Sequence, residues 1–165
     1  MHPPDPQLYI RPETANDSDF LLRLHRSTRE DLLLTGLPDQ MLEPLLAMQC
    51  HAQQSGYRQR FPDAAFSVIE KHGTAIGQLI VHRGGAGIRL VYLALLPQHR
   101  RRGYGRSVLR ALQEEAAVKC IPARLSVSLQ NIAAQRLYAL LGWSVIGNDG
   151  ASLEMIWLKP DVTDW

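Results

Sequence analysis

The stretch that decides the fold is residues 88–106, which read IRLVYLALLPQHRRRGYGR. Its first nine residues are apolar or aromatic except for Arg89, and Pro97 ends the run. Such a run predicts a strand from Ile88 to Leu96 that is buried on both faces and therefore central in a sheet. After the basic loop, apolar residues recur with the period of one helix face. These residues are Tyr104, Val108, Leu109, Leu112 and Ala116.

The loop between strand and helix carries two glycines, Gly103 and Gly105, within a run of arginines. The first N–H groups of a helix have no partner inside the helix, and the helix dipole adds partial positive charge there. Glycine lets a ligand approach the backbone, and arginines raise the local positive potential. This combination predicts a site for a phosphate or pyrophosphate. The P-loop pattern would need glycine at Arg100 and lysine at Arg106, and the dinucleotide fingerprint would need glycine at Val108, so both fit badly.

The segments on either side give the order of the remaining elements. Upstream we expect a strand over residues 8–11 and then a helix capped by Thr14, Asn16 or Asp17. A second helix should follow and reach about residue 57, with Pro44 in its first turn. Two strands over 64–70 and 75–82, joined by a tight turn, should come next. Downstream we expect a strand over 123–129, a helix from Asn131 to Leu141 stopped by Gly142, and strands near 143–146 and 152–158. This order predicts an α/β or α+β domain with a mixed sheet, in which residues 88–129 form a right-handed crossover.

Bulk properties restrict the class of protein. The chain has 165 residues, enough for one domain with a core, and its net charge of +2 does not suit a polycation built to hold nucleic acid. We expect a single domain over residues 1–165, with loose tails at 1–7 and 160–165. Neither Cys50 and Cys120 nor the six histidines show metal-ligand spacing, so we expect free thiols and no metal. The absence of a signal-peptide pattern and of a long apolar run favours a cytoplasmic protein without membrane contact.

Two motifs resemble those of the GNAT superfamily of acyl-CoA-dependent N-acetyltransferases. Arg100-x-x-Gly103-x-Gly105 is similar to the family pattern Q/R-x-x-G-x-G/A and stands in the same strand–loop–helix context. Residues 131–143 are similar to the second family signature, N-x-x-A-x-x-L-Y-x-x-x-G-F, with Trp143 in place of phenylalanine. The resemblance implies a GNAT-like, mostly antiparallel sheet of six to seven strands. It also implies a central parallel pair that splays at a bulge, and about four flanking helices.

The resemblance further implies which residues bind acetyl-CoA, the co-substrate. The backbone of Leu93, Ala94 and Leu95 would pair with the pantetheine arm, and the Leu95 N–H would polarise the thioester carbonyl. Asn131 would contact the pantetheine, and Tyr138 would donate a proton to the departing thiolate. A phenol with a pKa near ~10 is a competent acid for a thiolate whose conjugate acid has a pKa near ~8.5. The pyrophosphate would be held by Arg100, Arg101, Arg102, Gly103, Tyr104, Gly105 and Arg106.

The acceptor is implied only as a primary amine on a small molecule or a peptide, and a homodimer is reasonable for this family. The attacking amine must be neutral, which costs about 4.6 kcal/mol at pH 7 for a lysine-like amine of pKa ~10.4. Some family members carry a glutamate base five residues before the asparagine, but Ser126 holds that position here. A water relay, an acceptor of low pKa, or a base among Glu70, His82 and His99 all stay open.

The absence of a recognisable base also supports an alternative, a non-catalytic acyl-CoA-binding or sensor module. A nucleic-acid-binding domain is disfavoured, because the basic residues form one short cluster and no row of aromatic residues suits base stacking. Turnover with an amine would separate the transferase from the binding module.

Overall fold

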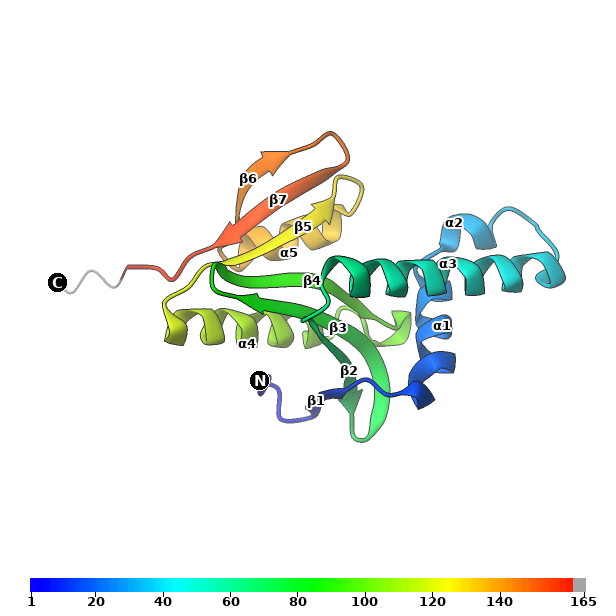
Figure 1. Ribbon diagram of the computed structural model, residues 1–165, viewed down its shortest axis with the longest axis horizontal. Coiled ribbons are helices and arrows are strands. Elements are labelled where there is room, and N and C mark those ends of the chain that lie inside the picture. Colours follow the sequence, from blue (N-terminus) through cyan, green and yellow to red (C-terminus); the bar gives the residue numbers. More distant parts are fainter. Residues whose placement is uncertain (162–165) are drawn as a thin grey trace.

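The computed structural model describes residues 1–161, which form one mixed sheet with helices on both faces (Figure 1). Residues 162–165, part of the predicted C-terminal tail, lie outside the described residues. The strands are β1 (Leu8–Pro12), β2 (Ala65–Lys71), β3 (Thr74–Gly84), β4 (Gly87–Leu95), β5 (Ala123–Ser128), β6 (Ser144–Asn148) and β7 (Ser152–Trp157). The helices are α1 (Ser18–Ser27), α2 (Glu30–Leu33), α3 (Asp39–Arg60), α4 (Tyr104–Lys119) and α5 (Ile132–Leu140), with short 3-10 turns η1 (Ala15–Asp17) and η2 (Pro97–His99).

The sheet has seven strands in the order β1-β2-β3-β4-β5-β7-β6. Neighbouring strands are antiparallel except β4 and β5, which are parallel and joined by the crossover helix α4. The predicted mixed, mostly antiparallel sheet is therefore confirmed, including its single central parallel pair. The β2–β3 turn is formed by His72 and Gly73, whose φ angles of 49° and 76° give the left-handed pair that suits a two-residue hairpin.

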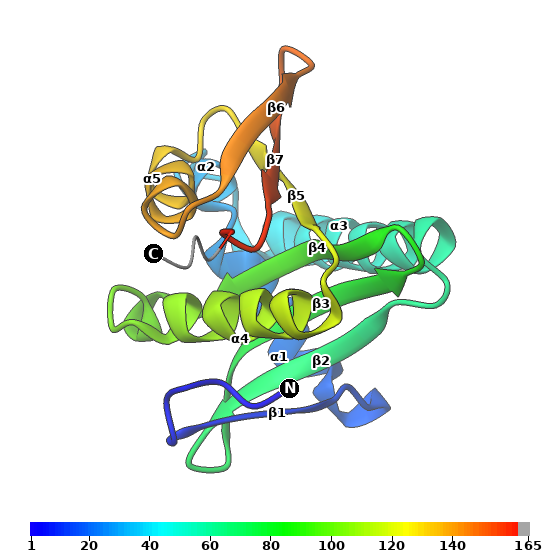
Figure 2. The same ribbon diagram turned by 90° about the vertical axis from the view of Figure 1, so that its left-hand side faces the viewer.

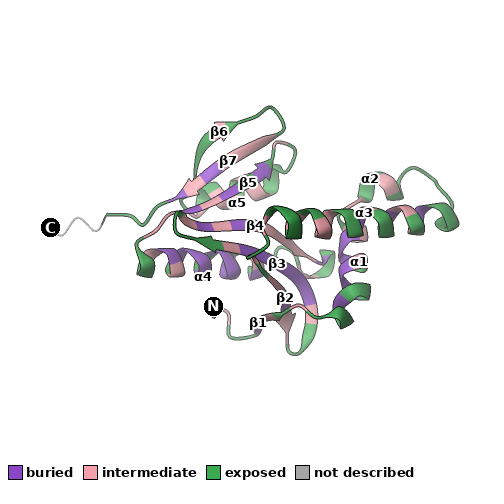
Figure 3. Ribbon diagram, viewed as in Figure 1, coloured by how far each residue is buried: buried purple, intermediate pink, exposed green. Residues whose placement is uncertain are grey.

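Helices cover both faces of the sheet. Figure 2 shows α4 in front of the central strands and α3 behind them. On the α4 side, the large core cluster includes Leu79, Leu90, Leu109 and Leu125, and α5 packs against it. On the other side, a smaller cluster joins α1 to β2 and to Leu96 at the end of β4. Figure 3 shows the buried residues concentrated on the central strands and on the helix surfaces that face them.

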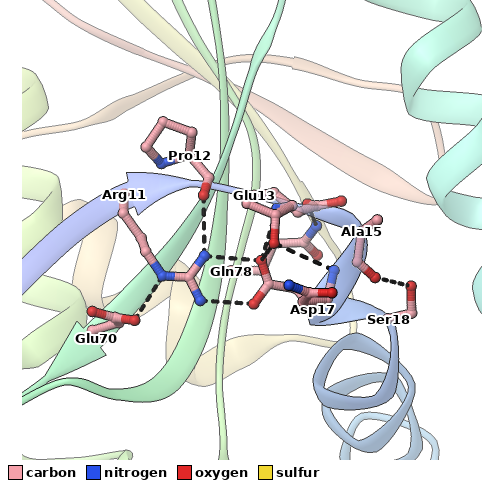
Figure 4. Close-up of polar contacts among 10 residues, drawn as sticks. Arg11, Pro12, Glu13, Ala15, Asp17, Ser18, Glu70 and Gln78 are labelled. Carbon is pink, nitrogen blue, oxygen red and sulfur yellow. Dashed lines mark hydrogen bonds and ion pairs between the residues drawn. The ribbon is translucent and has the colours of Figure 1, made fainter.

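Ion pairs around Arg11 fasten β1 to β2 and to the start of α1 (Figure 4). The Arg11 guanidinium donates to Glu70 on β2 at 2.6 Å and to the two carboxylate oxygens of Asp17 at 2.7 and 2.9 Å. Asp17 also accepts from the Thr14 N–H, and Thr14 is the N-cap residue of η1. Hydrogen bonds from Arg11 hold the pKa of Asp17 at about 2. The cluster therefore fixes where the helical layer begins relative to the sheet.

Two helical features differ from the sequence-based expectations. α3 starts at Asp39, so Pro44 lies in its second turn and not in the first. The proline ring removes the N–H that would bond to the Gln40 carbonyl, and Gln40 is exposed, so that carbonyl is not left unpaired in the core. The short helix α2 was not expected, because its four residues are too few to show a helical period.

The predicted burial of the central strand on both faces is wrong for its second half. Ile88 and Leu90 are buried, but residues 91–95 are only half-buried. The neighbouring strand leaves β4 at that point. At the N-terminus, the Asp5 N–H donates to Ser107 Oγ on α4 at 2.9 Å, which ties residues of the expected loose tail to the domain. None of the helices within residues 1–161 is both long enough and apolar enough to cross a membrane.

Candidate active site

A wedge-shaped gap between β4 and β5 is the centre of the candidate site. The two strands pair only over Ile88–Leu90 and Ala123–Leu125, three residue pairs, and then diverge, as Figure 1 shows. A bulge starts the divergence, because Leu90 pairs with Val81 and Tyr92 with Ile80, which leaves Val91 without an opposite residue. The prediction of a central parallel pair that splays at a bulge is confirmed at this residue.

The closed end of the gap is held by a close backbone approach. The Ile88 N–H donates to the Pro122 carbonyl at 2.9 Å. Gly87 has a φ of +139°, and a Cβ there would lie 2.5 Å from the same carbonyl oxygen. Only glycine satisfies both conditions, so the two strands meet at one defined point.

Backbone groups of β4 point into the gap at alternate residues. The Leu96 N–H donates to the Ile76 carbonyl of the β3 side at 2.8 Å. Because strand groups alternate in direction, Leu95 and Leu93 turn their N–H and C=O groups away from β3 and into the gap. Ala94 turns its own groups toward β3, where it pairs with Gln78. Of the three predicted backbone contacts, the structure therefore directs Leu93 and Leu95 into the gap and turns Ala94 away from it.

The arginine- and glycine-containing loop lies where β4 ends and α4 begins. Arg101 and Gly103 have φ angles of 59° and 83°, and left-handed residues in such a loop turn consecutive N–H groups toward a common point. Gly103 is the N-cap residue of α4, and Gly105 lies in its first turn. A Cβ on Gly105 would meet only Leu95 Cδ1, at 3.9 Å, so the space above the helix start is open. Tyr104 is different, because its side chain is buried in the core.

The arginines of this loop have two different environments. Arg100 Nε donates to the Leu95 carbonyl at 2.9 Å, which joins the loop to the end of β4. Arg101, Arg102 and Arg106 are exposed, and within residues 1–161 none of the three forms a salt bridge. Their charges are therefore available to an anion at the N-terminus of α4. This geometry fits the diphosphate of a nucleotide-type co-substrate.

Helix α5 brings the second predicted group to the same side of the sheet. Asn131 is its N-cap residue, and its side-chain oxygen accepts from the Ala134 N–H at 3.2 Å. Gly142, at a φ of 90°, ends the helix, and the Trp143 N–H donates back to the Tyr138 carbonyl at 3.0 Å. The Tyr138 ring lies 6.0 Å from the Trp143 ring, and burial raises the pKa of Tyr138 to about 12. The phenol is thus fully protonated at neutral pH.

The face of the sheet opposite α4 holds two residues that sequence reasoning did not select. Tyr92 lies on β4 beside the bulge, and its ring is 5.6 Å from that of Tyr57 on α3. Burial, with a smaller effect of Tyr57, raises the pKa of Tyr92 to about 12. Gln53 donates to the Tyr57 hydroxyl at 3.3 Å and also contacts buried His25. The single aromatic residue in the apolar run, Tyr92, was the only sequence signal for this pair.

A bidentate ion pair crosses the same face at the closed end of the gap. Arg89 Nη1 and Nη2 donate to the two carboxylate oxygens of Glu154, at 2.6 and 3.1 Å. The sequence signal for this pair was Arg89, the single charge in the apolar run. Of the three residues suggested as bases, Glu70 is bound by Arg11 and His99 packs on Tyr104. His82 is the register partner of Arg89 on β3, and its ring packs on Phe61.

Comparison with known proteins identifies the family and the fold. The sequence matches the acetyltransferase (GNAT) family over residues 29–143. No curated protein sequence matches the chain. Among solved structures, the PaiA N-acetyltransferase of Thermoplasma acidophilum in complex with coenzyme A has a TM-score of 0.69 at 20% identity, over 92% of this chain and 99% of that one. The ribosomal-protein-S18-alanine N-acetyltransferase of Escherichia coli has a TM-score of 0.64 at 16% identity, over 96% and 99%.

A third similar structure is a spermidine N-acetyltransferase chimera from Vibrio cholerae and hSSAT, with a TM-score of 0.64 at 19% identity, over 92% and 95% of the two chains. At these identities the structures show a shared fold. The family assignment comes from the sequence match, which covers more than half of the chain, and the two motifs that predicted it both lie inside residues 29–143. The chain belongs to the GNAT acetyltransferase family.

Proposed function

We propose that the chain transfers an acetyl group from acetyl-CoA to a primary amine by direct attack of the amine on the thioester. The observation that carries the proposal is the gap between β4 and β5. It offers the Leu93 and Leu95 N–H groups of a central strand, and it leads to the open N-terminus of α4 at Gly103 and Gly105. An extended amide arm ending in a diphosphate complements both features.

The roles of the backbone groups follow from their order along the gap. An arm that starts at the N-terminus of α4 passes Leu95 first and reaches Leu93 nearer the closed end. The N–H groups of Leu93 and Leu95 point in the same direction, into the gap. Each can therefore donate to the arm or to the thioester oxygen. A backbone N–H aimed at that oxygen stabilises the negative charge that develops there during attack. Arg101, Arg102 and Arg106 would add positive charge at the diphosphate.

Tyr138 is proposed as the hydrogen-bond donor to the departing sulfur. Its α5 helix lies on the same face as α4, and its ring packs against the core cluster that Leu93 and Leu95 also contact. A pKa of about 12 keeps the hydroxyl protonated throughout the neutral range. Asn131 is proposed to contact the pantetheine with its amide NH2, because its carbonyl oxygen is used to cap α5.

The proposed acceptor class is a primary amine. The similar structures are named for acceptors as different as spermidine and the alanine of a ribosomal protein, so their names do not select one acceptor. A homodimer and a cytoplasmic location remain predictions for this chain. Light scattering of the purified protein tests the first, and fractionation of the source cells tests the second.

The test is calorimetric titration with acetyl-CoA of the wild type and of Gly105→Glu, with Gly105→Ala as the matched control. The alanine meets only one atom, at 3.9 Å, so it should keep binding. The glutamate places negative charge where the diphosphate is expected, yet an acid in the first turn suits the helix dipole and should not prevent folding. We expect binding by the wild type and the alanine variant, and loss in the glutamate variant. Equal binding by all three would place acetyl-CoA elsewhere, and binding without thiol release from any amine would favour a sensor module.

A further inference from the structure

We propose that Glu154 on β7 accepts the proton that the attacking amine loses. The inference rests on the proposed acetyl transfer and names a base, which the sequence does not reveal. Glu154 is the register partner of Ser126 on β5, so the two side chains lie on the same face of the sheet, about 5 Å apart at Cβ. Ser126 follows Leu125, the last β5 residue that pairs with β4. The carboxylate therefore belongs to the closed end of the gap.

The ion pair with Arg89 draws the Glu154 carboxylate toward β4. Arg89 lies on β4, one residue before Leu90, and its guanidinium reaches Glu154 across β5. Because both carboxylate oxygens bond to Arg89, the carboxylate lies over β5 on the side toward β4. The Glu154 side chain remains 32% exposed, and each oxygen accepts one bond from Arg89, so each keeps a lone pair for a further donor.

The face on which Glu154 lies separates it from the leaving group. Ser126 and Arg124 alternate with Leu125 and Val127, which are buried on the α4 and α5 side. Glu154 therefore lies on the opposite face, together with the Tyr57 and Tyr92 pair. An amine approaching from this face would meet the thioester from one side, while Tyr138 approaches the sulfur from the other. Proton acceptor and proton donor are thereby placed on the two sides of the reacting carbon.

The proton balance follows directly. The amine nitrogen forms a bond to the acetyl carbon, the carbon–sulfur bond breaks, and the nitrogen gives one proton to the Glu154 carboxylate, directly or through one water. The sulfur leaves as a thiolate that Tyr138 stabilises and that takes a proton from solvent. No oxidant, metal or further reactant is needed. The guanidinium of Arg89 holds the carboxylate in one orientation through both oxygens. A nitrogen that has begun to bond to carbon carries positive charge and gives up its proton readily.

A matched ion pair elsewhere in the chain provides the control. Arg83 donates to both carboxylate oxygens of Glu115 at 2.7 and 2.9 Å, but Glu115 lies on α4, on the other side of the sheet. Replacing either glutamate removes one bidentate pair with an arginine, and replacing Glu115 also removes its contact with Lys119 at 2.8 Å. Only Glu154 is near the gap, so only its loss should change the chemistry.

The experiment measures thiol release from acetyl-CoA with spermidine, Nα-acetyllysine amide and an alanyl dipeptide as acceptors. It compares the wild type, Glu154→Ala and Glu115→Ala. We expect Glu154→Ala to lose about 10²- to 10⁴-fold in kcat with an unchanged calorimetric affinity for acetyl-CoA, and Glu115→Ala to stay within a few-fold of the wild type. Sodium formate should restore part of the Glu154→Ala rate relative to sodium chloride at equal ionic strength, which a structural defect would not allow.

Full activity of Glu154→Ala would overturn the proposal, as would a loss that formate does not restore or that Glu115→Ala shares. A wild type that binds acetyl-CoA but acetylates none of the three amines would instead contradict the proposed transferase itself. Circular dichroism of each variant confirms that the comparison is made between folded proteins.

Discussion

Replacing Tyr138 by phenylalanine should separate the chemical step from co-substrate binding. The ring would keep its contact with Trp143, 6.0 Å between centroids, so the fold and the affinity for acetyl-CoA should be preserved. The hydroxyl has a pKa of about 12, and a thiol has one near ~8.5, so complete proton transfer to the sulfur is uphill by roughly 4.8 kcal/mol. Tyr138 is therefore expected to act as a hydrogen-bond donor whose bond strengthens as negative charge appears on sulfur. Losing one such donor costs about 2.7–4 kcal/mol, or roughly 10²- to 10³-fold in kcat.

The assay is thiol release at saturating acetyl-CoA, measured from pH 6 to 10.5, together with calorimetric affinity for acetyl-CoA. In the wild type, Tyr138 should cause no loss of kcat over this range, because its pKa of about 12 lies above it. An unchanged kcat in Tyr138→Phe would refute the donor role. An alkaline decrease near pH 8–9 that disappears in the variant would refute the claim that burial keeps the phenol protonated.

Three further predictions concern stability, each measured by urea denaturation. Gly77→Ala places a Cβ 2.4 Å from a β4 carbonyl oxygen and should destabilise the protein by about 3 kcal/mol. Gly56→Ala, where a Cβ would have nothing within 4 Å, should be neutral or stabilising. Equal changes in the free energy of unfolding for the two variants would contradict the close contact at Gly77. Tyr92 and Tyr138 have folded-state pKa values of about 12, so their contribution to stability should be complete below pH ~10. It should be lost as the pH rises through about 12, by up to about 2.7 kcal/mol per phenol. A free energy of unfolding that stays flat up to pH 11.5 would argue against burial as the cause of the raised pKa values. Asp17, with a pKa of about 2, contributes stability that is present above pH ~4 and lost as the pH falls through about 2, so Asp17→Asn should cost roughly 2–3 kcal/mol at pH 7 and flatten that acid dependence.

The sequence predicts the parts of the fold whose signal is local. The apolar run ending at Pro97 and the glycines of the following loop indicate a central strand and the start of a helix, and both lie where expected. Gly142 stops α5 for the reason given by its left-handed φ of 90°. Each of these features depends on a few consecutive residues, so reading them requires no knowledge of distant contacts.

The features that the sequence does not predict depend on strand register. The burial of β4 was overestimated, because the number of neighbours on its second half depends on where β5 departs. Glu154 and Arg89 are 65 residues apart, and the pairing of β5 with both β4 and β7 brings them together. The sequence position where a base is expected, five residues before Asn131, holds Ser126. The carboxylate of Glu154, the proposed base, lies opposite Ser126 on the neighbouring strand β7.

Only three residue pairs join the two halves of the sheet, and the same pairs form the closed end of the gap. Strands β2, β3 and β4 are antiparallel neighbours joined by short turns, as are β6 and β7, whereas β4 and β5 are parallel and α4 lies between them in the sequence. A parallel contact across a whole helix is slower to form than a hairpin, so we expect the local β2–β3–β4 and β6–β7 hairpins to form before β4 pairs with β5. Additional residue pairs between β4 and β5 would favour the pairing of these strands, but they would fill the gap. The short β4–β5 pairing thus keeps the gap open at the expense of faster folding. Substitutions that speed folding by extending this pairing should therefore reduce co-substrate binding.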